Sequence, residues 1–171
     1  MKRLYIVRNA HAAIGALDRE RELDEQGLKE LESIGSQIVA QGMRPNIILT
    51  SSARRSVETA KHIREVFGLL VNVIDIREDL YDADIHKILE ILRLLPDEKN
   101  SVMLIASNPS ITELSTSITN SEYEDIPNGA VVVVELRLRH WKDLGLREGR
   151  KLALIKPQVT ENNTGKITVN L

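Results

Sequence analysis

Three apolar runs in the sequence end in side chains of types that bind anions. These are Arg8, Asn9 and His11 after the first run, Ser51, Arg54 and Arg55 after the second, and Ser107 and Asn108 after a later one. Guanidinium groups offer fixed pairs of donors, and hydroxyl groups and helix N-termini add further donors and partial positive charge. Residue types alone therefore indicate an anion site. They leave open whether it is a phosphate cradle or a set of arginines paired with surface acids.

The pattern of apolar residues predicts the elements that must position these side chains. Short apolar, β-branched runs predict buried strands at 4–7, 47–49, 71–76, 102–105, 130–136 and 151–155. Helical spacing predicts one helix capped by Asp24 and ended by Gly42 and Pro45, and further helices at 53–67, 84–95 and 111–118. This alternation predicts an α/β fold with a mostly parallel central sheet covered on both faces. Ligands of such sheets bind at the carboxyl ends of the strands, where the polar groups above are found.

Composition limits the classes of protein to which the chain can belong. Its 171 residues fit one domain, expected over 1–157, with a tail at 158–171 that is either a short edge strand or a floppy end. A net charge of −2 argues against nucleic acid as the main partner. The absence of cysteine excludes thiol chemistry, and no apolar run approaches a membrane span. We expect a soluble, cytoplasmic protein.

Four segments, in order along the chain, resemble motifs of the histidine phosphatase superfamily. The segment VRNAHA at 7–12 resembles its opening R-H-G or R-H-A motif. Residues 21–27, 49–60 and 105–110 are similar to its R-x-L-T-x-x-G, L-x-S-P-A-x-R-A-x-x-T-A and G-H-N-P segments, with Ser52 where proline is usual. The Leu80-Tyr81 pair, the 126–130 segment and the 141–144 turn resemble the small bacterial phosphohistidine phosphatases, over positions 1–157.

The resemblance implies a fold, a ligand and a set of site residues. The fold is a three-layer α/β/α sandwich of the phosphoglycerate mutase type. The expected ligand is a phosphorylated protein, bound through phosphohistidine, or a small phosphate compound, with no cofactor and no metal. None of the four histidines has a metal-ligand spacing such as H-x-x-x-H. The predicted phosphate-binding residues are Arg8, Arg55, Asn9, Ser107, Ser51, Asn108 and Arg21.

The sequence departs from the family at both catalytic histidines. Asn9 stands where the family has its nucleophile, and Ser107 stands where a second histidine opens the G-H-N-P segment. The nitrogen of an amide is delocalised into its carbonyl and is a poor nucleophile, so Asn9 cannot carry a phosphoryl group. Asn9 and Ser107 can still donate hydrogen bonds to phosphate oxygens. We therefore predict phosphate binding with turnover lost or strongly impaired.

Two alternatives remain open at this point. His11 is a surrogate nucleophile if the chain rearranges, because residues two apart on a strand lie roughly 6 to 7 Å apart, whereas attack needs roughly 3 to 3.5 Å. Otherwise His11 is a loop residue at the mouth of the pocket. The second alternative is a scaffold whose interactions do not depend on phosphate.

Three smaller assignments also remain open. The leaving-group acid is unassigned: Asp79, Asp82 and Asp84 flank Tyr81, but acids there commonly cap the following helix. Arg21 approaches the pocket or pairs with a neighbouring glutamate. Arg54 is expected on the surface, about 100° around the helix from Arg55.

Overall fold

A computed structural model describes residues 1–15 and 17–158. Within them, one sheet contains β1 Lys2–Arg8, β2 Ile47–Ser51, β3 Ile74–Arg77, β4 Ser101–Ala106, β5 Val131–Leu136 and β6 Gly149–Ile155. The strand order is β3-β2-β4-β1-β5-β6. Strands β1 to β4 run parallel, whereas β5 is antiparallel to β1 and β6 is antiparallel to β5. The prediction of a mostly parallel sheet is confirmed.

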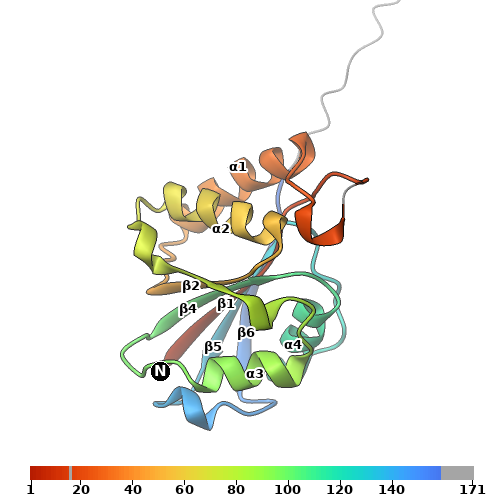
Figure 1. Ribbon diagram of the computed structural model, residues 1–171. Helices are drawn as coiled ribbons and strands as arrows, with labels where there is room; N and C mark the ends of the chain where they lie inside the picture. The colour runs from red at the N-terminus through yellow and green to blue at the C-terminus, as the bar shows by residue number, and fades with distance from the viewer. Residues whose placement is uncertain (16, 159–171) are drawn as a thin grey trace, which may run out of the picture.

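Helices cover both faces of the sheet. The described residues contain α1 Glu25–Ala40, α2 Arg54–Val66, α3 Ile85–Arg93 and α4 Ser110–Thr119. Figure 1 shows α1 and α2 on one face and α3 and α4 on the other. The predicted three-layer arrangement is therefore confirmed. None of the helices that the structure describes is long and apolar enough to cross a membrane.

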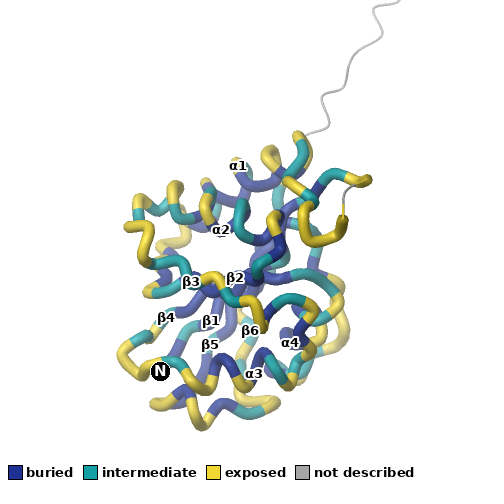
Figure 2. The backbone as a smooth tube through the Cα atoms, in the orientation of Figure 1, coloured by how far each residue is buried: buried dark blue, intermediate teal, exposed yellow. Residues whose placement is uncertain are grey.

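The hydrophobic core has two halves because successive side chains of a strand point to opposite faces. On β1, Leu4 and Ile6 belong to the half beneath α3 and α4, whereas Tyr5 and Val7 belong to the half beneath α1 and α2. All four side chains are buried, and Figure 2 shows the central strands as the most continuously buried part of the chain. The central strands are thus held from both sides, which fixes the positions of the residues at their ends.

The start of α1 is fixed by Asp24 and Gly27. Oδ1 of Asp24 accepts a hydrogen bond from the Gly27 amide at 2.9 Å, so the predicted N-cap is confirmed. A Cβ atom on Gly27 would overlap the carbonyl oxygen of His11. Glycine at this position therefore lets α1 pack directly against the segment that follows β1 and carries the candidate site.

The third predicted strand is shifted in the structure. Residues 71–73 form a 3-10 turn, and β3 runs over Ile74–Arg77. Pairing with β2 starts at Ile74, opposite Ile48, and Val71 is exposed. β-branched residues favour a strand only where a partner strand is available, and β2, which begins at Ile47, is too short at its start to reach Val71 in this register. The predicted end of the domain at residue 157 stays a prediction, and the apolar alternation at 167–171 lies outside the described residues.

Candidate functional site

The carboxyl ends of three neighbouring strands meet at one edge of the sheet. Arg8 ends β1 and lies opposite Ala106, the last residue of β4, while Ser51 ends β2 on the other side of β4. Ser107 and Asn108 follow β4 directly, and α2 begins at Arg54, immediately after β2. Polar groups that are far apart in the sequence are therefore neighbours here.

A polar cavity of about 340 Å³ lies at this edge, and we call it the basic cavity. Its lining residues are Arg8, Asn9, His11, Ala12, Asp18, Arg21, Arg55, Ser107, Asn108 and Asn128. Three arginines against one aspartate give the lining a formal charge of +2. The structure thus brings seven of the eight predicted site residues into one cavity, with Ser51 outside it.

Asn9 and Ser107, which replace the two family histidines, contact each other. The Ser107 hydroxyl donates to Oδ1 of Asn9 at 2.8 Å, and Nδ2 of Asn9 donates to the Ala10 carbonyl at 2.9 Å. Ser107 in turn accepts from Nε and Nη2 of Arg55, at 3.3 and 3.0 Å. We expected the Asn9 amide and the Ser107 hydroxyl to donate to an anion. In this structure both donors are directed at protein acceptors.

Arg55 is nearly surrounded by protein acceptors. Its side chain is 9% exposed, and besides Ser107 it donates to the Asp18 carbonyl at 2.7 Å and to Oδ2 of Asp18 at 3.2 Å. Tyr81 also donates to Oδ2 of Asp18, at 2.9 Å, and Arg21 lies 3.6 Å from Oδ1. The Tyr81 hydrogen bond, together with Arg55 and Arg21, lowers the pKa of Asp18 although partial burial opposes this. A carboxylate of the chain therefore occupies donors that an anion would need.

Arg8 is held by the segment before β5. Its Nη1 donates to the Ile126 carbonyl at 2.8 Å and lies 3.6 Å from Oδ2 of Asp125. Asp125 also accepts from Asn108, at 2.8 Å. Asn128 donates to the Asn9 carbonyl at 3.1 Å and closes the cavity on this side. These contacts place the Arg8 guanidinium on the wall of the basic cavity.

Arg21 belongs to the cavity and not to a pair with a glutamate. Its Nε donates to the Ala13 carbonyl at 2.7 Å, and its Nη2 donates to the Ala12 carbonyl at 3.1 Å. Its acidic neighbour is Asp18. The alternative in which Arg21 pairs with a neighbouring glutamate is therefore wrong. Arg54 pairs with Glu22 and Glu58 on the surface, as predicted.

His11 lines the same cavity with a fixed ring orientation. Its Nδ1 lies 2.6 Å from Oδ2 of Asp24, and its backbone amide donates to Glu30 at 2.8 Å. Burial raises the pKa of Asp24, but the hydrogen bonds from Gly27 and His11 outweigh it, and the pKa lies below its ordinary value. Asp24 therefore caps α1 and orients His11 at once. In the described part of the chain, no three histidine, aspartate or glutamate side chains gather as metal ligands.

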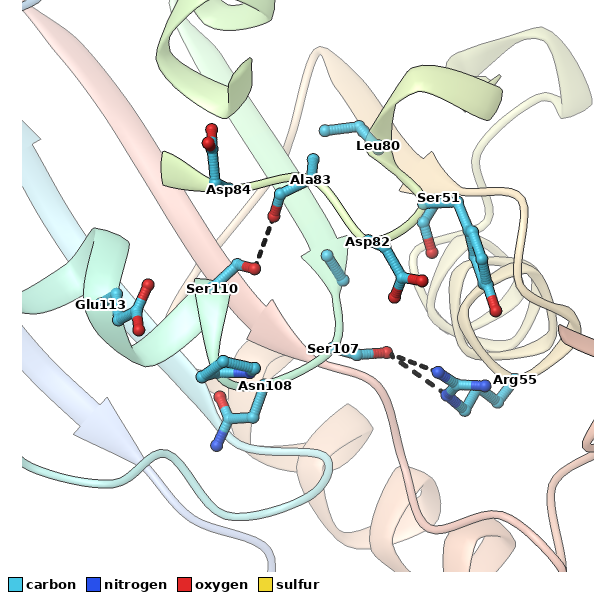
Figure 3. Close-up of a pocket in the computed structure, with 13 residues that line it drawn as sticks. Ser51, Arg55, Leu80, Asp82, Ala83, Asp84, Ser107, Asn108, Ser110 and Glu113 are labelled. Carbon is cyan, nitrogen blue, oxygen red and sulfur yellow. Dashed lines mark hydrogen bonds between the residues drawn. The ribbon is translucent and has the colours of Figure 1, made fainter. Parts of the chain in front are cut away.

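A second cavity of about 230 Å³ adjoins the first, and we call it the acidic cavity. Figure 3 shows it between the end of β2, the segment before α3 and the start of α4. It shares Arg55, Ser107 and Asn108 with the basic cavity, and it contains Ser51. Of the three candidate acids, Asp84 caps α3 through the Lys87 amide at 2.8 Å, and Asp79 pairs with Arg77. Asp82 lines the acidic cavity.

Sequence reasoning missed two polar residues that line the basic cavity. Asp18 lies in a 3-10 turn, Asp18–Glu20, within a stretch that carries no motif, so no local signal pointed to it. Asn128 follows Pro127 and precedes Gly129, a turn signal that marks the segment returning to β5. Both residues reach the site through tertiary contacts.

The chain has no match among protein-family models, and no curated protein matches it. Solved structures do match. The first is a protein assigned as the phosphohistidine phosphatase SixA of Nakamurella multipartitia, with TM-score 0.82 and 18% identity over 92% of this chain and 97% of that one. The protein histidine phosphatase SixA complexed with tungstate matches with TM-score 0.77 and 20% identity, over 91% of this chain and 97% of that one. A protein assigned as the phosphohistidine phosphatase SixA of Agrobacterium tumefaciens matches with TM-score 0.77 and 24% identity, over 91% of this chain and 98% of that one. The chain therefore has the fold of the SixA phosphohistidine phosphatases.

Proposed function

We propose that this chain is a phosphate-binding member of the histidine phosphatase superfamily that binds phosphohistidine, or a small phosphate compound, with little or no turnover. The observation that carries the proposal is the basic cavity, in which Arg8, Arg21 and Arg55 meet at the carboxyl ends of the strands. Arginine pairs bind phosphate through charge-assisted, bidentate hydrogen bonds. The SixA fold supports the choice of phosphohistidine within the class of phosphorylated ligands.

The loss of turnover follows from the two replaced histidines. Transfer through a phosphoenzyme needs an unprotonated ring nitrogen at position 9 to attack phosphorus, and Asn9 offers only an amide. The second imidazole would stabilise charge in the transition state, and Ser107 supplies a neutral hydroxyl in its place. The mutual hydrogen bond between the two side chains satisfies both without an anion. The arginines are thus retained, whereas the nucleophile is not.

Titration with inorganic phosphate, followed by NMR or calorimetry, tests the proposal. We expect saturable binding at millimolar phosphate in the wild-type chain. Arg8→Gln and Arg55→Gln should each weaken it about tenfold, because a hydrogen bond to a charged group contributes about 1.5 kcal/mol. Arg54→Gln is the matched control, since it removes the same charge from the next position of α2 without entering the cavity.

The buried position of Arg55 requires a second measurement. Its loss leaves Asp18 and Ser107 without a partner, so Arg55→Gln can unfold the chain. Thermal melting of each variant separates lost folding from lost binding, and Arg8→Gln tests the same cavity from a less buried side chain. Absence of saturable binding in the folded wild-type chain would remove the proposal.

A second candidate function is weak phosphatase activity through His11. The 2.6 Å contact between Nδ1 of His11 and Asp24 favours it, because donation from Nδ1 leaves Nε2 as the nitrogen with a free lone pair. Nε2 would attack phosphorus, the bond from phosphorus to the leaving imidazole would break, and water would then release phosphate. A phosphohistidine peptide and p-nitrophenyl phosphate are the test substrates. A rate in the wild-type chain that His11→Ala abolishes supports this function, and a rate that is absent or unchanged by the substitution removes it.

A further inference from the structure

The acidic cavity and the basic cavity carry opposite charge and share a wall. Asp82, Asp84 and Glu113 against Arg55 give the acidic cavity a formal charge of −2, beside the +2 of its neighbour. The shared residues include Arg55 and Ser107, and Figure 3 shows the hydrogen bonds that join these two side chains in the lining of the acidic cavity. A ligand that fills both cavities would therefore present an anion to the basic cavity and a cation to the acidic cavity.

The walls of the acidic cavity are apolar and its rim is acidic. Leu80, Ala83, Ala106 and Pro109 line it, and the first two and Ala106 belong to the hydrophobic core. Glu113 is exposed on the first turn of α4. An apolar wall with carboxylates at the opening matches a lysine or arginine side chain, which buries its methylene stem and keeps its charged end near water.

Ser51 supplies an observation that is independent of the acidic residues. It ends β2 and is only 3% exposed, and its hydroxyl has no hydrogen-bond partner among the described residues. Figure 3 shows its oxygen directed into the cavity, on the side where Asp82 lies. Unlike the hydroxyl oxygens of Ser52 and Ser56, that of Ser51 is not fully buried, so a polar group of a ligand in the cavity can reach it and form a hydrogen bond.

Asp82 faces the same space. Its carboxylate is free of ion pairs and hydrogen bonds within the described residues, and Figure 3 shows it directed towards Ser107 and Arg55. Its φ of 51° lies in the left-handed region, which a residue other than glycine adopts at some cost. Asp84, by contrast, uses one oxygen to cap α3. Asp82 is thus the carboxylate best placed to receive a cation.

We propose that the acidic cavity binds the protonated side chain of a lysine or arginine next to the phosphorylated residue of a protein ligand. The inference rests on the proposed function, because the phosphoryl group in the basic cavity fixes the register of the ligand. Asp82 and Glu113 receive the charge, the apolar wall receives the stem, and Ser51 accepts a hydrogen bond from the charged end. The partner is then a phosphoprotein with a basic flank, and not a free phosphate compound.

A pair of peptides separates this inference from the proposed function. Both carry a stable triazole analogue of phosphohistidine, one flanked on both sides by lysine and the other by norleucine, which keeps the stem and lacks the charge. Inorganic phosphate is titrated in parallel. At low salt we expect the lysine peptide to bind about tenfold tighter than the norleucine peptide, and salt should reduce the difference because the carboxylates are exposed.

Substitutions in the acidic cavity locate the effect. Asp82→Asn with Glu113→Gln should make the two peptides equal within about twofold and should not weaken binding of inorganic phosphate. Glu98→Gln is the matched control, because Glu98 lies before β4, at the opposite edge of the sheet, and should leave the preference intact. Equal binding of both peptides to the wild-type chain, while phosphate binds, overturns this inference alone. Absence of phosphate binding overturns the proposed function and this inference with it.

Discussion

Replacement of Asp18 by asparagine tests whether the chain carries its own competitor for the anion site. The Asp18 carboxylate lies 3.2 Å from Nη2 of Arg55 and 3.6 Å from Nη1 of Arg21, and both arginines line the basic cavity. Its pKa is lowered, first by the hydrogen bond from Tyr81, so the carboxylate is fully charged at neutral pH. A phosphate ion that binds these guanidiniums must displace this charge or be repelled by it.

The size of the effect follows from the exposure of the pair. The Asp18 side chain is 52% exposed, so each ion pair is treated as a surface pair worth about 0.5 kcal/mol. Loss of the two pairs amounts to about 1 kcal/mol, which is about fivefold in affinity. Asp18→Asn should therefore bind phosphate about fivefold tighter than the wild-type chain. When phosphate is absent, the free energy of unfolding of this variant should be about 1 kcal/mol lower than that of the wild-type chain.

The assay is a phosphate titration by calorimetry, combined with urea unfolding with and without phosphate. Glu20→Gln is the matched control, since it removes a charge from the same 3-10 turn and does not line the basic cavity. The opposite signs of the two expected effects make the prediction specific. Unchanged or weaker phosphate binding in a folded Asp18→Asn variant would refute the idea that this carboxylate competes with the anion.

Three further predictions concern the segment after β1 and the replaced histidines. Asp24→Asn keeps an N-cap but removes the negative charge at the start of α1 and beside His11, so it should lower the free energy of unfolding by about 0.5 to 1 kcal/mol at neutral pH. Because the native pKa of Asp24 is lowered, its contribution is complete above its unfolded pKa of about 3.9 and is lost as the pH falls through the native value. The stability difference between wild type and variant, measured by urea unfolding, should therefore shrink below about pH 4. Gly27→Ala should cost about 1 to 3 kcal/mol, measured in the same way, because its Cβ would overlap the His11 carbonyl oxygen. Asn9→His combined with Ser107→His should give measurable hydrolysis of p-nitrophenyl phosphate, because both positions line a cavity that retains its arginines.

Control variants and contrary results make these predictions testable. Ser36→Ala, at an exposed position of α1, should change stability by less than about 0.5 kcal/mol and sets the scale for Gly27→Ala. A stability difference for Asp24→Asn that does not depend on pH would contradict the lowered pKa. For the double histidine variant, Asn9→His alone is the comparison. No hydrolysis by a folded double variant would mean that further parts of the site have diverged from the active enzymes.

The fold was largely predictable because its signals are local. Short β-branched runs alternate with amphipathic helices. Asp24 marks the start of α1 because its side chain accepts a hydrogen bond from the amide of Gly27, only three residues further along the chain. The boundary of β3 was not predictable, since β2 decides where pairing begins. The edge of the sheet that gathers the site followed from the same alternation, because parallel strands place their carboxyl ends together.

By itself, the sequence determined which chemical groups the site contains and which it lacks: arginines at 8 and 55, and no imidazole at 9 or 107. The tertiary structure alone decided how those groups are engaged. Only folding brings Asp18 onto Arg55, Ser107 onto Asn9, and an acidic cavity beside a basic one. These contacts join residues 37 and 98 positions apart, and their strength depends on burial and direction. Neither the burial of these contacts nor their direction is encoded in local spacing. The residue types therefore predicted an anion site, whereas the fold determined which protein groups accept the hydrogen bonds of its donors.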